Sequence, residues 1–97
     1  MKKIYISVPM SGKDLSEQEL KSRKAEIKLL KSGFDVVNPF DLVPEVETPS
    51  YEDYMKKDLE ALKECTAILL CPEWNMSNGC KRELKQALED GLHIMVD

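Results

Sequence analysis

The stretch Ala67-Ile68-Leu69-Leu70-Cys71 is the longest apolar run in this chain of 97 residues. Its continuous apolar character is typical of a strand that is buried on both faces of a parallel sheet. Similar short runs predict three further strands, at Ile4–Val8, Phe34–Asn38 and His93–Val96. Helical spacing of apolar residues separates these runs, over Glu17–Ser32, Tyr51–Glu64 and Asn78–Asp90. The order β-α-β-α-β-α-β predicts a three-layer α/β fold, in which an open sheet of about four parallel strands has right-handed crossovers.

The composition is that of an ordinary globular domain, and we expect a single domain over residues 1–97. The chain has 14 Lys and Arg against 18 Asp and Glu, a formal net charge of −4. This mild acidity argues against a protein that coats a nucleic-acid polymer, which usually needs a basic surplus. The longest apolar run is far shorter than the roughly 20 residues of a membrane span. We therefore expect neither nucleic-acid polymer nor membrane as a partner.

The cysteine and histidine content indicates the compartment. Cys65, Cys71 and Cys80 form no C-x-x-C pair, and the chain has 1 His. An odd cysteine count favours a reducing compartment, and a single His makes a conventional zinc site improbable. The N-terminus enters a strand pattern at once and shows no signal-peptide core. These features predict a cytoplasmic protein without a structural metal, in which the cysteines are small buried hydrophobic residues.

Two glycines mark the edge of the sheet where a ligand would bind. Gly12 and Gly79 follow the first and third predicted strands, and the loops at the carboxyl ends of parallel strands line the ligand crevice of such folds. Gly33 and Gly91 instead follow helix ends, where a left-handed conformation favours glycine. The proline-rich connection 39–50 is long for so small a domain, and it is either a lid or a rigid surface loop.

The three helices begin in different ways. Ser16 to Glu19 forms a capping-box pattern, and Ser50 to Asp53 forms a looser one, so both helices start with acids. The third begins Ser77-Asn78-Gly79-Cys80 and continues with Lys81 and Arg82, without an acid. A helix start with free N–H groups and basic neighbours favours an anion site. The alternative is that Ser77 or Asn78 simply caps the helix and that the two cations are solvated.

Two carboxylates lie on helix faces that should be buried. Glu83 shares a face with Cys80, Leu84, Ala87 and Leu88, whereas Asp58 shares one with Tyr54, Met55, Leu59 and Leu62. A buried carboxylate is costly unless it is paired or used. Two such acids, on helices that flank the same strand, favour a functional site. Alternatively, each acid lies at the margin of its stripe and forms a salt bridge with a neighbour such as Lys57 or Arg82.

The loop Val8-Pro9-Met10-Ser11-Gly12-Lys13 follows the first strand. Ser11 and Gly12 could offer a hydroxyl and backbone N–H groups to a phosphate, although neither the P-loop pattern nor G-x-G-x-x-G is present, and an ordinary turn explains the pair equally well. Tyr5, Tyr51, Tyr54 and Trp74 are further candidates for a pocket, and each is also a common core residue.

Several segments together resemble the nucleoside 2-deoxyribosyltransferase-like superfamily, especially its short phage and bacterial members. The Asp-Leu element and the later Ser-x-Gly-x-x-x-Glu-Leu element are fairly specific, and the resemblance runs nearly end to end. The segments are KIYISVPMSG at 3–12, Asn38-Pro39, YMKKDL at 54–59, CTAILL at 65–70 and SNGCKREL at 77–84 with Ala87.

The resemblance implies a role for each matching residue. Glu83 matches the catalytic nucleophile, Asp58 the acid that contacts the leaving base, and Tyr5 the tyrosine that orients the nucleophile. The substrate and its phosphate would be bound by the residues that match the monophosphate hydrolases of the superfamily, which are Ser11, Gly12, Ser77, Asn78 and Gly79. The expected pocket wall consists of Pro9, Met10, Asn38, Tyr54 and Trp74.

The resemblance also implies a flavodoxin-like sheet, a homodimer or larger homo-oligomer, and cleavage of an N-glycosidic bond without a metal or other cofactor. The substrate would be a nucleoside or a deoxynucleoside 5′-monophosphate, whose phosphate Lys81 or Arg82 could help to hold. Water as acceptor makes a hydrolase, and a second base makes a transferase. The sequence ends at the fourth strand, whereas the characterised enzymes continue. The alternative hypothesis is therefore a catalytically weak or inert module that binds or sequesters nucleotides.

Overall fold

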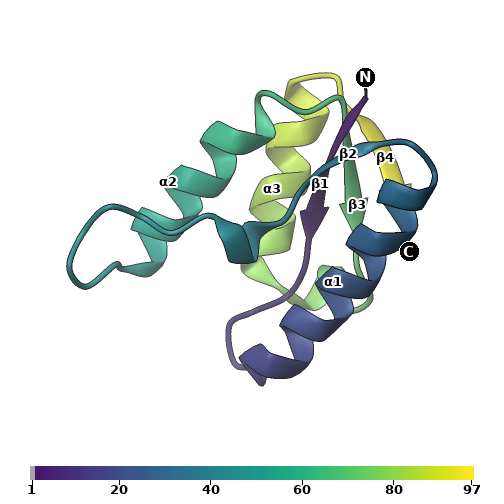
Figure 1. Ribbon diagram of the computed structural model, residues 1–97. Helices are drawn as coiled ribbons and strands as arrows, with labels where there is room; N and C mark the ends of the chain where they lie inside the picture. The colour runs from purple at the N-terminus through teal and green to yellow at the C-terminus, as the bar shows by residue number, and fades with distance from the viewer. Residues whose placement is uncertain (1) are drawn as a thin grey trace.

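A computed structural model describes residues 2–97 and shows four strands that alternate with three α-helices (Figure 1). All strands pair in parallel, in the order β2-β1-β3-β4. The predicted fold class and element order are confirmed. The elements are β1 (Lys3–Ser7), α1 (Leu15–Lys31), β2 (Asp35–Val37), α2 (Tyr51–Leu62), β3 (Ala67–Leu70), α3 (Asn78–Glu89) and β4 (His93–Val96). Two short 3₁₀ helices are η1 (Pro39–Asp41) and η2 (Trp74–Met76).

The sheet lies between two helical layers, with α1 on one face and α2 and α3 on the other (Figure 1). Because side chains alternate along a strand, β1 contributes Ile4 and Ile6 to the α1 side and Tyr5 to the opposite side. Each face of the sheet thus has its own apolar cluster. All three cysteines are buried, as predicted.

The connections place an opening at one end of the sheet. From β1 the chain passes through α1 to β2 at one edge, and it then returns through α2 to β3 on the other side of β1. The loops that follow β1 and β3 therefore diverge over opposite faces. In open α/β sheets the ligand crevice lies at such a point, outside the carboxyl ends of the strands.

The starts of the helices correct one prediction and confirm another. Asp14 caps α1, and its side chain accepts from the backbone N–H groups of Ser16 and Glu17, so the predicted capping box at Ser16 is wrong. The helix begins at Leu15, two residues before the position that a cap at Ser16 would give, so Asp14 is the N-cap residue. The capping box of Ser50 and Asp53 is complete.

The buried stripes of α2 and α3 are narrower than predicted. Met55 and Leu62 are buried on α2, and Cys80 and Ala87 on α3. Tyr54 is 43% exposed and Leu88 is 61% exposed, and both predictions of burial were wrong. The two helices pack over one sheet face, so residues at the margins of the stripes remain in solvent.

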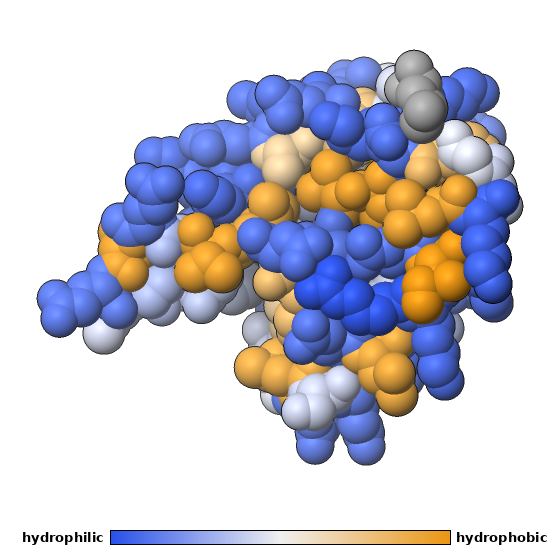
Figure 2. Space-filling view, viewed as in Figure 1, coloured by the Kyte–Doolittle hydropathy of each residue, from blue (hydrophilic) through white to orange (hydrophobic). Residues whose placement is uncertain are grey.

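The surface has apolar areas on a protruding loop. Figure 2 shows apolar side chains on the loop that protrudes before α2, where Val43 and Val46 are half-exposed or more. Within residues 2–97, none of the helices is long and apolar enough to cross a bilayer.

Candidate active site

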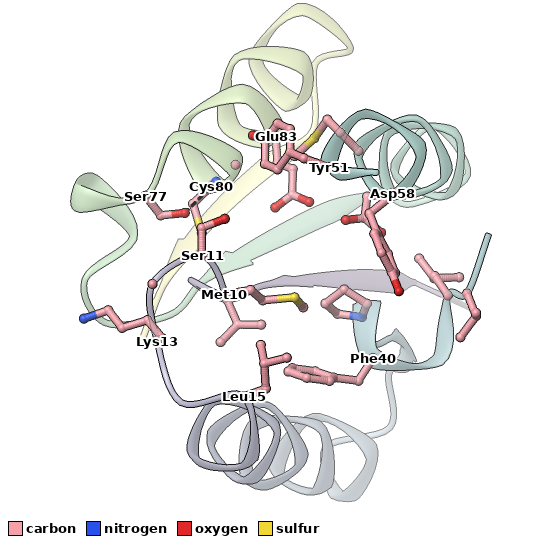
Figure 3. Close-up of a pocket in the computed structure, with 18 residues that line it drawn as sticks. Met10, Ser11, Lys13, Leu15, Phe40, Tyr51, Asp58, Ser77, Cys80 and Glu83 are labelled. Atoms are coloured by element: carbon pink, nitrogen blue, oxygen red, sulfur yellow. Dashed lines mark hydrogen bonds between the residues drawn. The ribbon is translucent and has the colours of Figure 1, made fainter. Parts of the chain in front are cut away.

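A cavity of about 570 Å³ opens at the carboxyl ends of β1 and β3 (Figure 3). Its wall combines the loop after β1, the η1 segment, one face of α2 and the first turns of α3. The predicted site residues that line it are Met10, Ser11, Gly12, Tyr54, Asp58, Ser77, Gly79 and Glu83. The fold therefore brings together groups that are distant in the sequence, at the predicted edge of the sheet.

Glu83 is held by two hydroxyl groups from the central strand. Tyr5 Oη donates to Glu83 Oε2 and Ser7 Oγ donates to Oε1, each at 2.6 Å. Tyr5 and Ser7 are alternate residues of β1, so both face α3. Glu83 is only 4% exposed, and Tyr5 reaches it from behind the cavity wall. The carboxylate is thus fixed at the bottom of the cavity by a rigid element.

Asp58 is the second buried acid in the same wall. It is 8% exposed, and within residues 2–97 its Oδ1 atom is buried without a hydrogen-bond partner. In Figure 3 the carboxyl groups of Asp58 and Glu83 point into the cavity and toward one another. A buried polar atom without a partner is costly, which is typical of a site that binds a ligand or a proton.

The alternative prediction, that each acid pairs with a basic neighbour, is wrong. None of the ion pairs among the described residues includes Asp58 or Glu83. Arg82 instead binds Glu52 at 2.6 Å and lies over the ring of Tyr51. Because one side of α3 faces inward at Cys80 and Glu83, the intervening Lys81 and Arg82 point outward and do not line the cavity. The suggestion that these two cations hold a phosphate is corrected accordingly.

The acid pair retains a proton near neutral pH. Burial raises the pKa of Glu83 to about 7, against the effect of the hydrogen bonds from Ser7 and Tyr5. Burial, and then the charge of Glu83, raises the pKa of Asp58 to about 8. The two groups titrate together, and the hydroxyl hydrogen bonds stabilise the ionised form of Glu83. The proton therefore lies mainly on Asp58. Burial also raises the pKa of Tyr5 well above its ordinary value, which keeps this phenol a donor.

The other end of the cavity carries polar and cationic groups. Ser11, Gly12 and Lys13 come from the loop after β1, and Ser77 and Gly79 come from the start of α3. Gly12 has a φ of +73°, a conformation that glycine adopts readily. The Lys13 ammonium forms a 2.8 Å ion pair with Glu73, which follows β3. This end of the cavity thus supplies a hydroxyl, a small backbone turn and a cation.

Ser77 caps α3, as one of the two interpretations of this helix start predicted. Its side chain accepts from the backbone N–H of Cys80 at 3.2 Å. No acid lies in the first turn of α3. At Gly79 an added Cβ would lie 3.2 Å from Met55 Cε, so the start of α3 approaches α2 closely.

Five residues predicted for the site do not line the cavity, namely Tyr5, which reaches Glu83 from behind the wall, and Pro9, Asn38, Trp74 and Asn78. Asn38 is buried and donates to Ser22 Oγ and Glu26 Oε1, while its own Oδ1 accepts from the Phe40 N–H. These bonds hold the η1 segment, which places Phe40 in the wall. Trp74 packs against the apolar cluster on the α2 and α3 side instead.

Several site residues were missed by the sequence analysis. Ser7 could have been found, since a residue two positions after Tyr5 on a strand shares its face. Lys13 was quoted with its loop, but it was not assigned to the site. The further wall residues that were missed are Val8, Leu15, Pro39, Phe40, Leu42, Val43, Met55 and Cys80, whereas Tyr51, a candidate from the sequence, does line the cavity. Most of these are apolar, and their helical or strand spacing alone indicates ordinary core.

The arrangement has the components of carboxyl-based catalysis. An ionised carboxylate beside a protonated one can supply a nucleophile and a general acid, the division of labour that retaining glycosidases use. Among residues 2–97, no group of three or more His, Cys, Asp or Glu side chains could hold a metal ion.

Comparison with solved structures finds enzymes that act on nucleosides or nucleotides. A 2-deoxyribosyltransferase from Bacillus psychrosaccharolyticus superposes with a TM-score of 0.75 and 29% identity, over 97% of this chain and 70% of that one. A CMP N-glycosidase from Clostridium botulinum gives 0.67 and 24%, over 98% and 70%. A 2-deoxyribosyltransferase from Leishmania mexicana gives 0.74 and 18%, over 99% and 63%. At the two lower identities the likeness supports the fold alone.

The family assignment comes from a separate comparison. No curated protein sequence matches the chain significantly. The family model described as "Domain of unknown function (DUF4406)" matches residues 2–96, and the chain therefore belongs to this family, with the fold of the nucleoside 2-deoxyribosyltransferases.

Proposed function

We propose that this protein cleaves the N-glycosidic bond of a nucleoside or a 2-deoxynucleoside 5′-monophosphate, with Glu83 as the nucleophile. The observation that carries the proposal is the pair of buried carboxyl groups in the wall of one cavity, neither of which forms an ion pair with a described residue. The likeness to a 2-deoxyribosyltransferase at 29% identity supports the same class of chemistry.

In the first step, a Glu83 oxygen attacks the anomeric carbon of the sugar as the bond to the base nitrogen breaks. The electron pair of the broken bond goes to the base, and the proton of Asp58 neutralises it. The products of this step are a glycosyl ester of Glu83, a neutral base and an ionised Asp58. The ionised Glu83 also stabilises the positive charge that develops on the sugar in the transition state.

In the second step, an acceptor releases the sugar from Glu83. When water attacks the anomeric carbon, Asp58 takes up its proton, the ester bond breaks and Glu83 becomes a carboxylate again. When the N–H group of a second base attacks, the same proton transfer gives a new nucleoside. The first acceptor makes a hydrolase and the second a transferase, and both use the same two carboxyl groups.

A 5′-phosphate would lie at the end of the cavity formed by Ser11, Gly12, Lys13 and Ser77. Lys13 is the cation in the wall, and a phosphate would draw it away from Glu73. The start of α3, which has no acidic residue in its first turn, adds the favourable end of a helix dipole.

The direct test is base release from a panel of nucleosides and their 5′-monophosphates, followed by chromatography. We expect release by the wild-type protein and a loss of at least about a thousandfold in Glu83→Gln. A 2-fluoro-substituted substrate, whose ester hydrolyses slowly, should add the mass of the sugar to the wild-type protein but not to Glu83→Gln. The matched control is Glu52→Gln, which removes a carboxylate outside the cavity.

Two outcomes would contradict the proposal. Equal base release by the wild-type protein and Glu83→Gln would exclude Glu83 as the nucleophile. Nucleotide binding by titration calorimetry, without base release over long incubation with any member of the panel, would favour the alternative hypothesis of a binding or sequestering module.

A further inference from the structure

Ser7 is the one hydroxyl group besides Tyr5 that contacts Glu83 among the described residues. Its side chain is fully buried, and its Oγ donates to Glu83 Oε1 at 2.6 Å, a short distance that is typical of a hydrogen bond to a charged acceptor. Ser7 is the last residue of β1, so the central strand of the sheet determines its position. A flexible loop has no part in this contact.

The groups around Glu83 give Ser7 a particular task. Tyr5 from β1 donates to the other carboxylate oxygen, Asp58 from α2 faces Glu83 across the cavity, and Cys80 lies one turn earlier on α3. Burial favours a protonated Glu83. The two hydroxyl donors, and Asp58 as long as it keeps its proton, favour the ionised form. An acid pair with one proton needs such an asymmetry, or the proton would reside on either group.

We propose that Ser7 is a positioning residue, which together with Tyr5 keeps Glu83 ionised and oriented and thereby leaves the single proton of the acid pair on Asp58. This inference rests on the proposed function for its catalytic meaning, but the hydrogen bond and the site of the proton can be tested without catalysis. Ser7 acts through Glu83 and does not itself line the cavity. Its hydroxyl also holds Oε1 in place, because a serine on a paired strand has little freedom to move.

The experiment measures the titration of the two carboxyl groups by NMR, with the side-chain carboxyl carbons of Glu and Asp labelled with ¹³C. The signals of Glu83 and Asp58 are identified by their loss in Glu83→Gln and Asp58→Asn. In the wild-type protein we expect Glu83 to ionise at a lower pH than Asp58. In Ser7→Ala, which removes one hydrogen bond to a charged acceptor, we expect the midpoint of Glu83 to rise by about one pH unit.

The matched control is Ser22→Ala, which removes another fully buried serine hydroxyl, one that faces Asn38 and the backbone of Glu19. It should leave the midpoints of Glu83 and Asp58 unchanged. If Ser7 contributed to packing alone, Ser7→Ala would change the melting temperature without moving the Glu83 midpoint.

Two results would overturn the inference. One is a wild-type protein in which Asp58 ionises before Glu83, a test that holds even should Ser7→Ala fail to fold. The other is a Glu83 midpoint in Ser7→Ala within about 0.3 pH units of the wild-type value, far below the shift expected from a hydrogen bond to a charge. Where base release is measurable, the acidic limb of its pH profile should move by the same amount as the midpoint. If no substrate is cleaved, the NMR titration still tests the role of Ser7. Failure of the proposed function can therefore be distinguished from failure of this inference.

Discussion

The protein should lose stability as the pH rises from 6 to 8, and Asp58→Asn should remove the part of this loss that comes from Asp58. In the unfolded chain Asp58 titrates near its ordinary pKa of 3.8, whereas burial and the charge of Glu83 raise its pKa to about 8 in the folded protein. Between these values the folded protein binds a proton that the unfolded chain has released. Stability therefore falls with rising pH through this window, and it levels off once Asp58 is ionised in the folded state as well.

The size of the effect follows from one proton. A full difference of one bound proton changes the free energy of unfolding by about 1.4 kcal/mol per pH unit. Between pH 6 and pH 8 the proton of Asp58 is partly lost at the upper end, so the expected decrease is about 2 kcal/mol. With a urea dependence of about 1–3 kcal/mol per molar, the unfolding midpoint should fall by about 1 M.

The assay is urea denaturation of the wild-type protein and Asp58→Asn, followed by circular dichroism at several pH values from 6 to 8. Asparagine has a similar shape and cannot ionise, so the difference between the two proteins cancels the other titrating groups. We expect Asp58→Asn to gain about 2 kcal/mol on the wild-type protein across this range. A difference between the two proteins that stays constant with pH would refute the reasoning, because Asp58 would then be ionised at pH 6.

Three further substitutions test the remaining parts of the site. Lys13→Ala should weaken binding of a nucleoside 5′-monophosphate about tenfold in titration calorimetry and leave the binding of free nucleosides unaffected. Glu73→Gln, which breaks the same ion pair but keeps the cation, should not weaken binding of the monophosphate. Gly12→Ala should lower the free energy of unfolding by about 1 kcal/mol, since alanine must adopt a φ of +73° while its Cβ meets no atom within 4 Å; an unchanged urea midpoint would contradict this. Asn38→Ala should cost about 2 kcal/mol in the same assay, because it strands buried partners in α1 and η1, and a loss below about 0.5 kcal/mol would show that water replaces the amide.

Local patterns were sufficient for the elements and for the two acids. The apolar runs and helical spacings predicted the four strands and three helices because a parallel sheet with covered faces demands buried strands. Asp58 and Glu83 were conspicuous because a carboxylate on an apolar helix face is costly. The start of α1 was misplaced, since two neighbouring residues can both cap a helix and only the backbone geometry selects Asp14.

The contacts of the acids depended on packing between distant segments. Whether Arg82 pairs with Glu83 or with Glu52 is decided by the rotation of α3 against the sheet, which turns residue 82 outward. Likewise, Asn38 could line the pocket or support it, and its hydrogen bonds to α1 show that it supports the wall. Neither result is encoded in spacing along the chain.

From its sequence by itself this protein is an α/β domain with two misplaced acids near a helix start that has no acidic residue, because periodicity and the cost of burying charge act within a single segment. Only the tertiary structure decided that the two acids share one cavity, that Tyr5 and Ser7 both donate to Glu83, and that Lys13, rather than Lys81 or Arg82, lies in the cavity wall. The physical reason is that hydrogen bonds, desolvation and charge interactions act over a few ångströms between side chains, and chain distance does not determine which side chains come that close.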